Sequence, residues 1–493
     1  MDDAESSDGM SDILSGLAAG SVAILIGDVY SSVMMFLSRV LPARLLDTDG
    51  YGLLILGLTA LNLLGPVAVL GLQRGLARNI AQADRERQVY LVRSGLHLAM
   101  GSSVVIGVAL FLSRGAMESI LDEPGLAPVL ALIAVALPGM TVAKLVTGGL
   151  LRGLTHATER VLINNVLRPT LIVVSIVLLA ETHGATGAAG GWAFALGVTA
   201  AVCLAVYLQF VRRGGGEFDP QYRFLLSFSL PLMVSGILVT SMRQIDNVVV
   251  GFFMDATSVA IYDASFTIAA VLMLAIHALR FLFMPVFSSL VDDDEVGQME
   301  RVYGIVTKWI VLLTLTPFLG IVLFSATVLE LVFRPEFVAG TTVLVVLASG
   351  FMLNATFGPT GPSLISLGET RTVMYVTGAG VVVNLVVNVM LIPVVGALGA
   401  AVASVCSYTA VNFLYFWRIH QVLGIQPFSL RQFLPTLLAV AVLVSATALV
   451  HDAVVTNVWL LPFVLGMYFA VHLGLTWMLG EIDEAEGQML LDR

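Results

Sequence analysis

Charge is what this sequence lacks most. Only 12% of its 493 residues are charged and 58% are hydrophobic, whereas an ordinary soluble domain carries about 25% charge. A water-soluble fold has no way to hide this much apolar surface, so the composition excludes the soluble classes. The relevant unit is instead the membrane-spanning helix, which needs roughly 20 apolar residues.

Lysine and cysteine are also scarce. Lys144 and Lys308 are the only lysines among 24 basic residues, and 34 acidic residues bring the net charge to −10. An acidic chain binds nucleic acid poorly, so we expect no nucleic-acid partner. Cys203 and Cys406 lie in apolar runs, where lone thiols are packing residues, and we predict neither a disulfide nor a metal site.

Catalytic motifs are missing too. The sequence has no phosphate-cradling Gly-Lys-Ser/Thr loop, no His/Cys set with the spacing of metal ligands and no nucleophile elbow. We therefore expect no cofactor and no enzyme activity.

Long runs without charge are abundant. The longest, 372–417, is too long for one span and is divided by Pro393 and Gly396. The runs are continuous rather than alternating, which favours helices over barrel strands. They predict fourteen transmembrane helices, near 13–38, 51–72, 92–113, 127–150, 161–180, 187–210, 223–253, 259–287, 303–331, 338–367, 371–393, 397–419, 430–450 and 457–479.

The basic residues orient these helices. With a cytoplasmic N-terminus, the inside loops hold 18 basic residues and the outside loops hold 4, as the positive-inside rule requires. Residues 1–12 are acidic and lack the basic start of a signal peptide. We place both termini in the cytoplasm and the protein in the cell membrane.

The chain also repeats itself. Gly184–Ala189 reads GATGAA and Gly396–Ala401 reads GALGAA, and three further matches share an offset near 211 residues. That offset corresponds to six helices, so both copies keep the same orientation, as in a parallel repeat. We expect an all-α integral membrane protein of two six-helix lobes plus two C-terminal helices. The expected divisions are an acidic cytoplasmic N-terminus 1–12, an N-lobe 13–213, a C-lobe 214–420, the last two helices 421–480 and an acidic tail 481–493.

Polar residues within the predicted spans are functional candidates, because ionisable groups are unfavourable in a bilayer. Helical spacing predicts one polar stripe on each helix that opens a repeat. On the first helix the stripe is Ser21, Asp28, Ser32 and Arg39; on helix 223–253 it is Gly236, Thr240, Arg243 and Asn247, with Asp246 at its border. We expect both stripes to wet a cavity between the lobes.

Structural interpretations of the same residues stay open. Arg243 and Asp246 are i,i+3 neighbours and can simply neutralise each other. Arg39 lies near the outer end of its helix, where an arginine can snorkel to the interface. Lys144 lies near an inner end, where anchoring is the better interpretation.

Several motifs together resemble one family. They are Ser38–Pro42, Gly50–Gly52, Ser229–Pro231, Asp246, Val249–Gly251, Ile261-Tyr262, Phe333–Phe337, Leu364–Thr370, Asn384, Asn388, Leu391–Pro393 and Gly399–Ala401. The chain resembles, over residues 13–480, the Wzx-like polysaccharide-biosynthesis flippases of the MOP superfamily, which also holds lipid II flippases and MATE exporters. The basic pair that lipid II flippases carry deep in the first helix is absent here, and the MATE-type Asp motif occurs in the second half alone.

The resemblance implies a transporter of polyprenyl-linked oligosaccharide. Its partners would be that substrate and membrane lipid, with glycan assembly enzymes as a further open candidate. For an anionic neck, Arg243 or Arg39 would pair with phosphate, while Asp28, Asn247 and Asn62 would bind sugar hydroxyls. The alternatives are a MATE-like cation or drug exporter and a membrane-embedded glycan polymerase or ligase.

Overall fold

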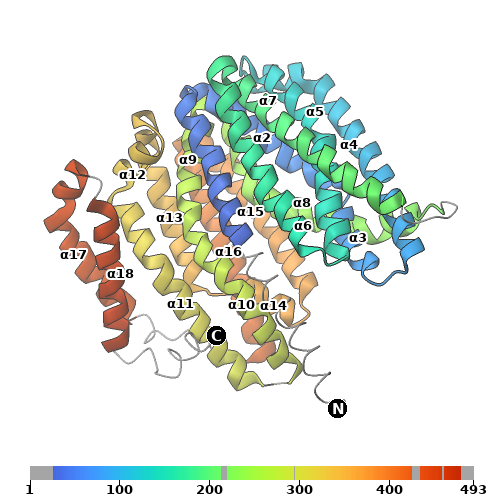
Figure 1. The fold of residues 1–493 in the computed structure, drawn as a ribbon. Coiled ribbons are helices and arrows are strands. Elements are labelled where there is room, and N and C mark those ends of the chain that lie inside the picture. The colour runs from blue at the N-terminus through green and yellow to red at the C-terminus, as the bar shows by residue number, and fades with distance from the viewer. Residues whose placement is uncertain (1–25, 213–218, 294, 425–433, 458–459, 479–493) are drawn as a thin grey trace, which may run out of the picture. The chain divides into compact units, whose positions relative to one another are not determined.

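The structure is a computed structural model, and it describes residues 26–212, 219–293, 295–424, 434–457 and 460–478. Every regular element in these ranges is helical (Figure 1). The termini 1–12 and 481–493, and Ser21 of the expected first stripe, lie outside the described residues. Two compact units, Met1–Ala260 and Ile261–Arg493, each hold their own core. These compact units meet at 260/261, which does not test the expected division between repeats at 213/214. That division stays a prediction.

The first unit begins with a helix over residues 26–45. Two π-helical segments, η1 (Val146–Leu151) and η2 (Leu162–Leu167), interrupt its later helices. After the first helix the α-helices are α2 (Thr48–Val69), α3 (Leu72–Ile80), α4 (Arg85–Leu121), α5 (Leu126–Leu145), α6 (Ala157–Val161), α7 (Arg168–Arg212), α8 (Tyr222–Phe253) and α9 (Ala256–Ala269). Helix α9 crosses the boundary between the units.

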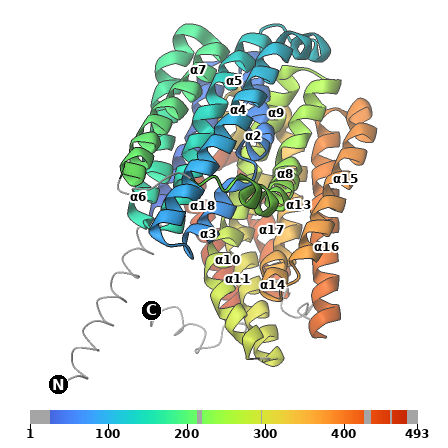
Figure 2. The ribbon, with the colours of Figure 1, turned by 90° about the vertical axis from the view of Figure 1, so that its right-hand side faces the viewer.

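The regular elements of the second unit are also helical in the described residues. Its helices are α10 (Met273–Asp292), α11 (Val296–Leu323), α12 (Ser325–Val332), α13 (Thr341–Thr356), α14 (Thr360–Ser366), α15 (Thr370–Val395), α16 (Ala397–Leu423), α17 (Leu434–Thr456) and α18 (Leu461–Met478). Figure 2 shows α15 and α16 side by side, in agreement with their extensive packing. The last two helices, α17 and α18, pack on α11 through a small apolar cluster of their own.

Two glycines break long apolar helices where the sequence predicted it. Gly184 interrupts α7 with φ 58° and ψ −141°, and Gly396 separates α15 from α16 with φ 64° and ψ −146°. This combination is open almost exclusively to glycine, because a Cβ would clash with the backbone. The two matched segments of the sequence thus adopt the same backbone turn.

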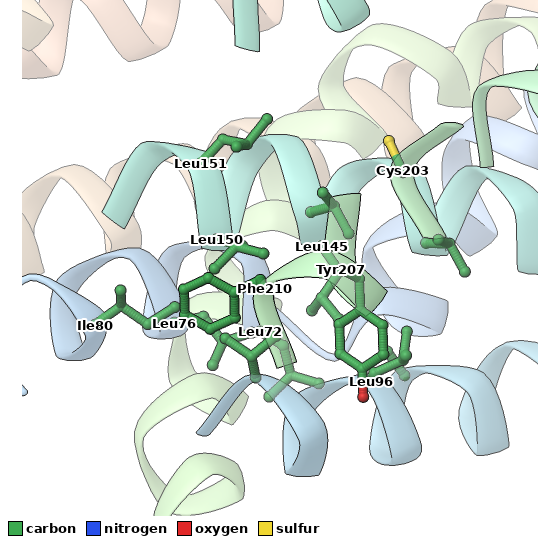
Figure 3. Packing of buried hydrophobic residues seen from close by; sticks show 14 of the residues in the cluster. Leu72, Leu76, Ile80, Leu96, Leu145, Leu150, Leu151, Cys203, Tyr207 and Phe210 are labelled. Carbon is green, nitrogen blue, oxygen red and sulfur yellow. The ribbon is translucent and has the colours of Figure 1, made fainter. Parts of the chain in front are cut away.

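One apolar cluster in the first unit includes the short helix α3. Its residues Leu72, Leu76 and Ile80 recur every four positions and are fully buried. Figure 3 shows them beside Leu150 and Phe210, which come from the π-helical segment and from α7. Burial of this stripe holds α3 against the unit, although a nine-residue helix is too short to be stable alone.

Helices long and apolar enough to cross a membrane number eleven in the described residues. Each of the fourteen expected positions overlaps a described helix, but the assignment of fourteen separate spans stays a prediction. The candidate span Ala157–Arg212, for example, contains both expected helices 161–180 and 187–210, with the break at Gly184 between them.

Candidate functional site

A pocket of about 130 Å³ lies within the first unit, where α2, α3, α5 and α8 meet. This volume is below the ~300–1,000 Å³ typical of sites for drug-sized ligands, so the pocket suits one small group. The lining residues with polar side chains are Gln73, Arg74, Lys144 and Thr240. The remaining lining residues are Gly65, Pro66, Val69, Gly71, Leu232, Met233, Gly236 and Val239.

Small residues create the space for these side chains. Gly71 joins α2 to α3 with φ 67°, and a Cβ there would come within 2.4 Å of the Ser229 carbonyl oxygen on α8. Only glycine permits both that conformation and that approach. On α2, a Cβ at Gly65 would lie 3.1 Å from the Lys144 ammonium nitrogen, so the missing side chain makes room for the lysine.

The electrostatics of the pocket are strongly positive. Lys144 is half-buried and Arg74 is exposed at the rim, and none of the described residues that line the pocket carries a carboxylate. Arg168, at the start of α7, adds a further positive charge that acts on Lys144. Among the described residues, neither Lys144 nor Arg74 forms an ion pair. An arrangement of cations without anions in a poorly solvated place favours an anionic ligand.

The structure places the α8 candidates at different depths. Thr240 lines the pocket, and Arg243, three residues further along α8, is exposed. Asp246 is buried and has a bonding partner, but no ion pair joins it to Arg243, both being described residues. The two side chains therefore form no direct ion pair in this structure, and their mutual neutralisation stays a prediction.

Asn247 has a structural contact. Its Nδ2 donates to the hydroxyl of Thr59 on α2 at 3.3 Å, and that hydroxyl donates to Gln244 Oε1 at 3.3 Å. This chain of hydrogen bonds fixes α8 against α2, which is also what positions the pocket. Asn62 is half-buried on α2, one turn before Gly65. Asn62 does not line the pocket. Its backbone carbonyl lacks the usual helical hydrogen bond, because Pro66, four residues later, has no N–H.

The first helix carries its own polar contact. Asn165, buried in the π-helical segment η2, donates to the Asp28 carboxylate at 2.6 Å. Asp28 and Ser32 are exposed, and the Ser32 hydroxyl donates to the Asp28 carbonyl at 2.7 Å. Arg39 is half-buried. π-Helical turns recur at functional sites, so Asn165 joins the candidates.

Sequence reasoning missed the basic pocket itself. The place of Lys144 near an inner helix end favours an anchor, and Arg74 belongs to the basic residues expected in cytoplasmic loops. Neither feature shows that α3 packs on α8. A signal was present in Leu72, Leu76 and Ile80, whose spacing of four residues is that of a short amphipathic helix. In the described ranges, no group of three or more His, Cys, Asp or Glu side chains gathers that could hold a metal ion.

The fold matches solved transporters. A lipid II flippase MurJ in an inward closed conformation aligns with a TM-score of 0.75 over 96% of this chain and 100% of that chain, at 11% identity. An inward-facing multidrug resistance MATE family transporter of the MOP superfamily aligns with a TM-score of 0.63 over 80% of this chain and 94% of that chain, at 16% identity. The fold is therefore that of the MOP transporters, and the protein is a multi-pass membrane protein.

The family follows from the sequence comparison. The model of the family described as "Polysaccharide biosynthesis protein" matches residues 41–340, which is more than half of the chain, so the chain belongs to this family. The probable low-salt glycan biosynthesis flippase Agl15 of Haloferax volcanii is 25% identical over 80% of this chain and 82% of that protein. The probable flippase AglR of the same organism is 26% identical over 35% of this chain and 37% of that protein.

Proposed function

We propose that the protein is a flippase for polyprenyl phosphate- or pyrophosphate-linked oligosaccharide. It moves this lipid from the cytoplasmic to the outer leaflet for the assembly of surface polysaccharide or glycoprotein glycans. Family membership and the similarity to Agl15 support the substrate class. The observation that carries the proposal is the pocket that holds Lys144 and Arg74 and has no carboxylate among its described lining residues.

The sign of that pocket separates two transporter functions. A glycan on a polyprenyl phosphate has an anionic neck, for which ammonium and guanidinium groups are suitable partners. A cationic drug would meet repulsion from Lys144 and Arg74 and from the nearby Arg168. The pocket therefore favours the glycan-lipid flippase over the MATE-like exporter.

The proposed architecture has fourteen spans and a parallel six-helix repeat, with both termini in the cytoplasm and the protein in the cell membrane. The identical backbone turns at Gly184 and Gly396 support the repeat. Transport proceeds by alternating access between the two halves of the repeat. Membrane lipid and the enzymes that make or use the glycan are its expected partners.

The remaining polar candidates have proposed roles along the path of the sugar. Arg243 and Arg39 attract the anionic neck, and Asn62 offers hydrogen bonds to sugar hydroxyls, as do the exposed Asp28 and Ser32. Asp246 and Asn247 act from buried positions on α8 by fixing the helix that carries Thr240 and Arg243.

Deletion of the gene in its source organism tests the proposal. Lipid-linked glycan should accumulate in the inner leaflet, where an impermeant lectin reaches it in inside-out vesicles but not in right-side-out ones. Accumulation of unassembled glycan in the outer leaflet would instead indicate a polymerase or ligase. An unchanged glycan distribution with greater sensitivity to cationic drugs would indicate an exporter.

A further inference from the structure

We infer that the pocket at Lys144 is a binding site for a single phosphate group, and that its ligand is the phosphate of the polyprenyl carrier. The inference rests on the proposed function and names the part of the substrate that this site holds. It also moves the main phosphate contact from the exposed Arg243 to Lys144 and Arg74.

The chemistry of the lining supports a phosphate ligand. Lys144 supplies an ammonium group from α5, Arg74 a guanidinium group from α3, and Thr240 a hydroxyl group from α8. Within the described chain, the hydroxyl of Thr240 and the amide of Gln73 form no hydrogen bond. Three helices thus contribute residues with hydrogen-bond donors to the lining of one small volume, and proteins recognise oxyanions through such donors.

The start of α3 adds a favourable dipole. The helix begins after Gly71, and Gly71 and Gln73 line the pocket. The first backbone N–H groups of a helix have no intrahelical acceptor and carry partial positive charge. The start of a helix would not define a site alone. Here α3 starts at a pocket that also holds Lys144, which has no acidic partner among the described residues.

The size and wall of the pocket indicate which part of the substrate enters. A volume of about 130 Å³ admits a phosphate group but not an oligosaccharide. Leu232, Met233 and Val239 make one wall apolar, which suits the first isoprene unit beside a phosphate. We therefore place the neck of the lipid in the pocket and the sugars outside it.

The two lysines of the chain make a direct test. The purified full chain is reconstituted in nanodiscs of phosphatidylcholine that contain either polyprenyl phosphate or the uncharged polyprenol. The amines are then acetylated and the peptides quantified. Lys308, half-buried on α11, is the internal reference. We expect polyprenyl phosphate to slow acetylation of Lys144 at least about fivefold and to leave that of Lys308 unchanged.

Two further arms separate the sources of phosphate. Equal protection of Lys144 by phosphatidylglycerol would overturn the assignment to the carrier, because the pocket would then hold bulk phospholipid. Protection by inorganic pyrophosphate but not by polyprenyl phosphate would overturn it in favour of a soluble anion. No protection in any arm would exclude a phosphate site at Lys144.

Variants separate binding from folding. Lys144→Met keeps the length of the side chain and removes an unpaired charge, so we expect the protein to fold with equal or greater thermal stability. Its affinity for polyprenyl phosphate, measured by native mass spectrometry, should fall about tenfold or more, which is about 1.4 kcal/mol. Lys144→Arg should bind within a few-fold of the wild type. Arg78→Gln, exposed on α3 outside the pocket, is the matched control for Arg74→Gln and should bind normally.

Failure of this site and failure of the proposed function give different results. A protein that moves glycan-lipid across vesicles while Lys144 stays unprotected keeps its function and loses this site. A protein with protected Lys144 that moves no glycan-lipid keeps the site and loses the function. Binding by Lys144→Met as tight as that of the wild type would overturn the inference whatever its transport activity.

Discussion

Glu123 offers the sharpest prediction about the stability of the first unit. The side chain lies in the turn between α4 and α5 and is only 6% exposed. Its carboxylate accepts a hydrogen bond from the backbone N–H of Ala256 at the start of α9. Helix α2 also packs closely against Ala256, since a Cβ at Gly52 would come within 1.8 Å of the Ala256 carbonyl oxygen. Glu123 therefore ties two turns of the unit together.

The charge of Glu123 is unfavourable at this buried position, although the hydrogen bond from Ala256 favours it. Burial raises the pKa of its carboxyl above the ordinary 4.5, and the Ala256 hydrogen bond only partly opposes that rise. The carboxylates of Asp49, Asp255 and Asp122 raise the pKa further. A folded-state pKa above the unfolded value means that the native protein holds the proton more tightly. Its contribution to stability is present below pH 4.5 and is lost as the pH rises through the folded pKa.

Two substitutions separate the hydrogen bond from the charge. Glu123→Ala removes the acceptor and leaves the Ala256 N–H unsatisfied, which costs about 1–3 kcal/mol. Glu123→Gln keeps an oxygen acceptor and removes the charge, so it should equal or exceed the wild type in stability at pH 7.5. The stability of Glu123→Gln should also fall less than that of the wild type as the pH rises above 4.5, because the variant has no carboxyl group to ionise at this position.

Thermal unfolding in detergent between pH 4.5 and 8 measures both effects. Glu123→Ala should unfold several degrees below the wild type at pH 7.5, and Glu123→Gln should not. The reasoning is refuted if Glu123→Ala matches the wild type, or if Glu123→Gln follows the wild-type pH dependence throughout.

Two further predictions concern a helix break and a charge on α8. Gly399→Ala would place a Cβ 2.7 Å from the Leu391 backbone and should destabilise the protein by about 1–3 kcal/mol, whereas Gly197→Ala meets no atom within 4 Å and should be neutral in the same thermal assay. Because no ion pair joins Arg243 to Asp246 in this structure, the double variant Arg243→Ala with Asp246→Ala should not recover transport lost in Arg243→Ala; full recovery in vesicles would show that the two charges do balance each other.

Much of the fold could be predicted, because a bilayer constrains sequence strongly. Charge-free runs near the length of a span predicted the positions of the helices, and Pro393 with Gly396 predicted the break between α15 and α16. The short helix α3 was missed, because Arg74 and Arg78 give it the composition of a cytoplasmic loop. The π-helical segments were missed too, since a shift in backbone hydrogen bonding leaves no pattern in the sequence.

The site was predicted less well, and for a physical reason. Thr240 lines the pocket as part of an expected polar stripe, but the depth of a polar side chain depends on what packs over it. Lys144 reads as an anchor near a helix end until Gly65 and the turn at Gly71 are seen to open space beside it. The amide of Asn247 donates to Thr59, a contact that its place in the polar stripe does not predict. Such contacts between helices are not reported by any spacing within one helix.

Transport by the purified protein is the most direct test of the flippase proposal. Vesicles would carry a fluorescent polyprenyl pyrophosphate disaccharide in one leaflet, and an impermeant quencher would report its arrival in the other. The wild type and Arg78→Gln should move the lipid, Lys144→Met should slow it about tenfold or more, and protein-free vesicles should not move it. If the wild type and protein-free vesicles move the lipid at the same rate, the protein is not a flippase for this class of substrate.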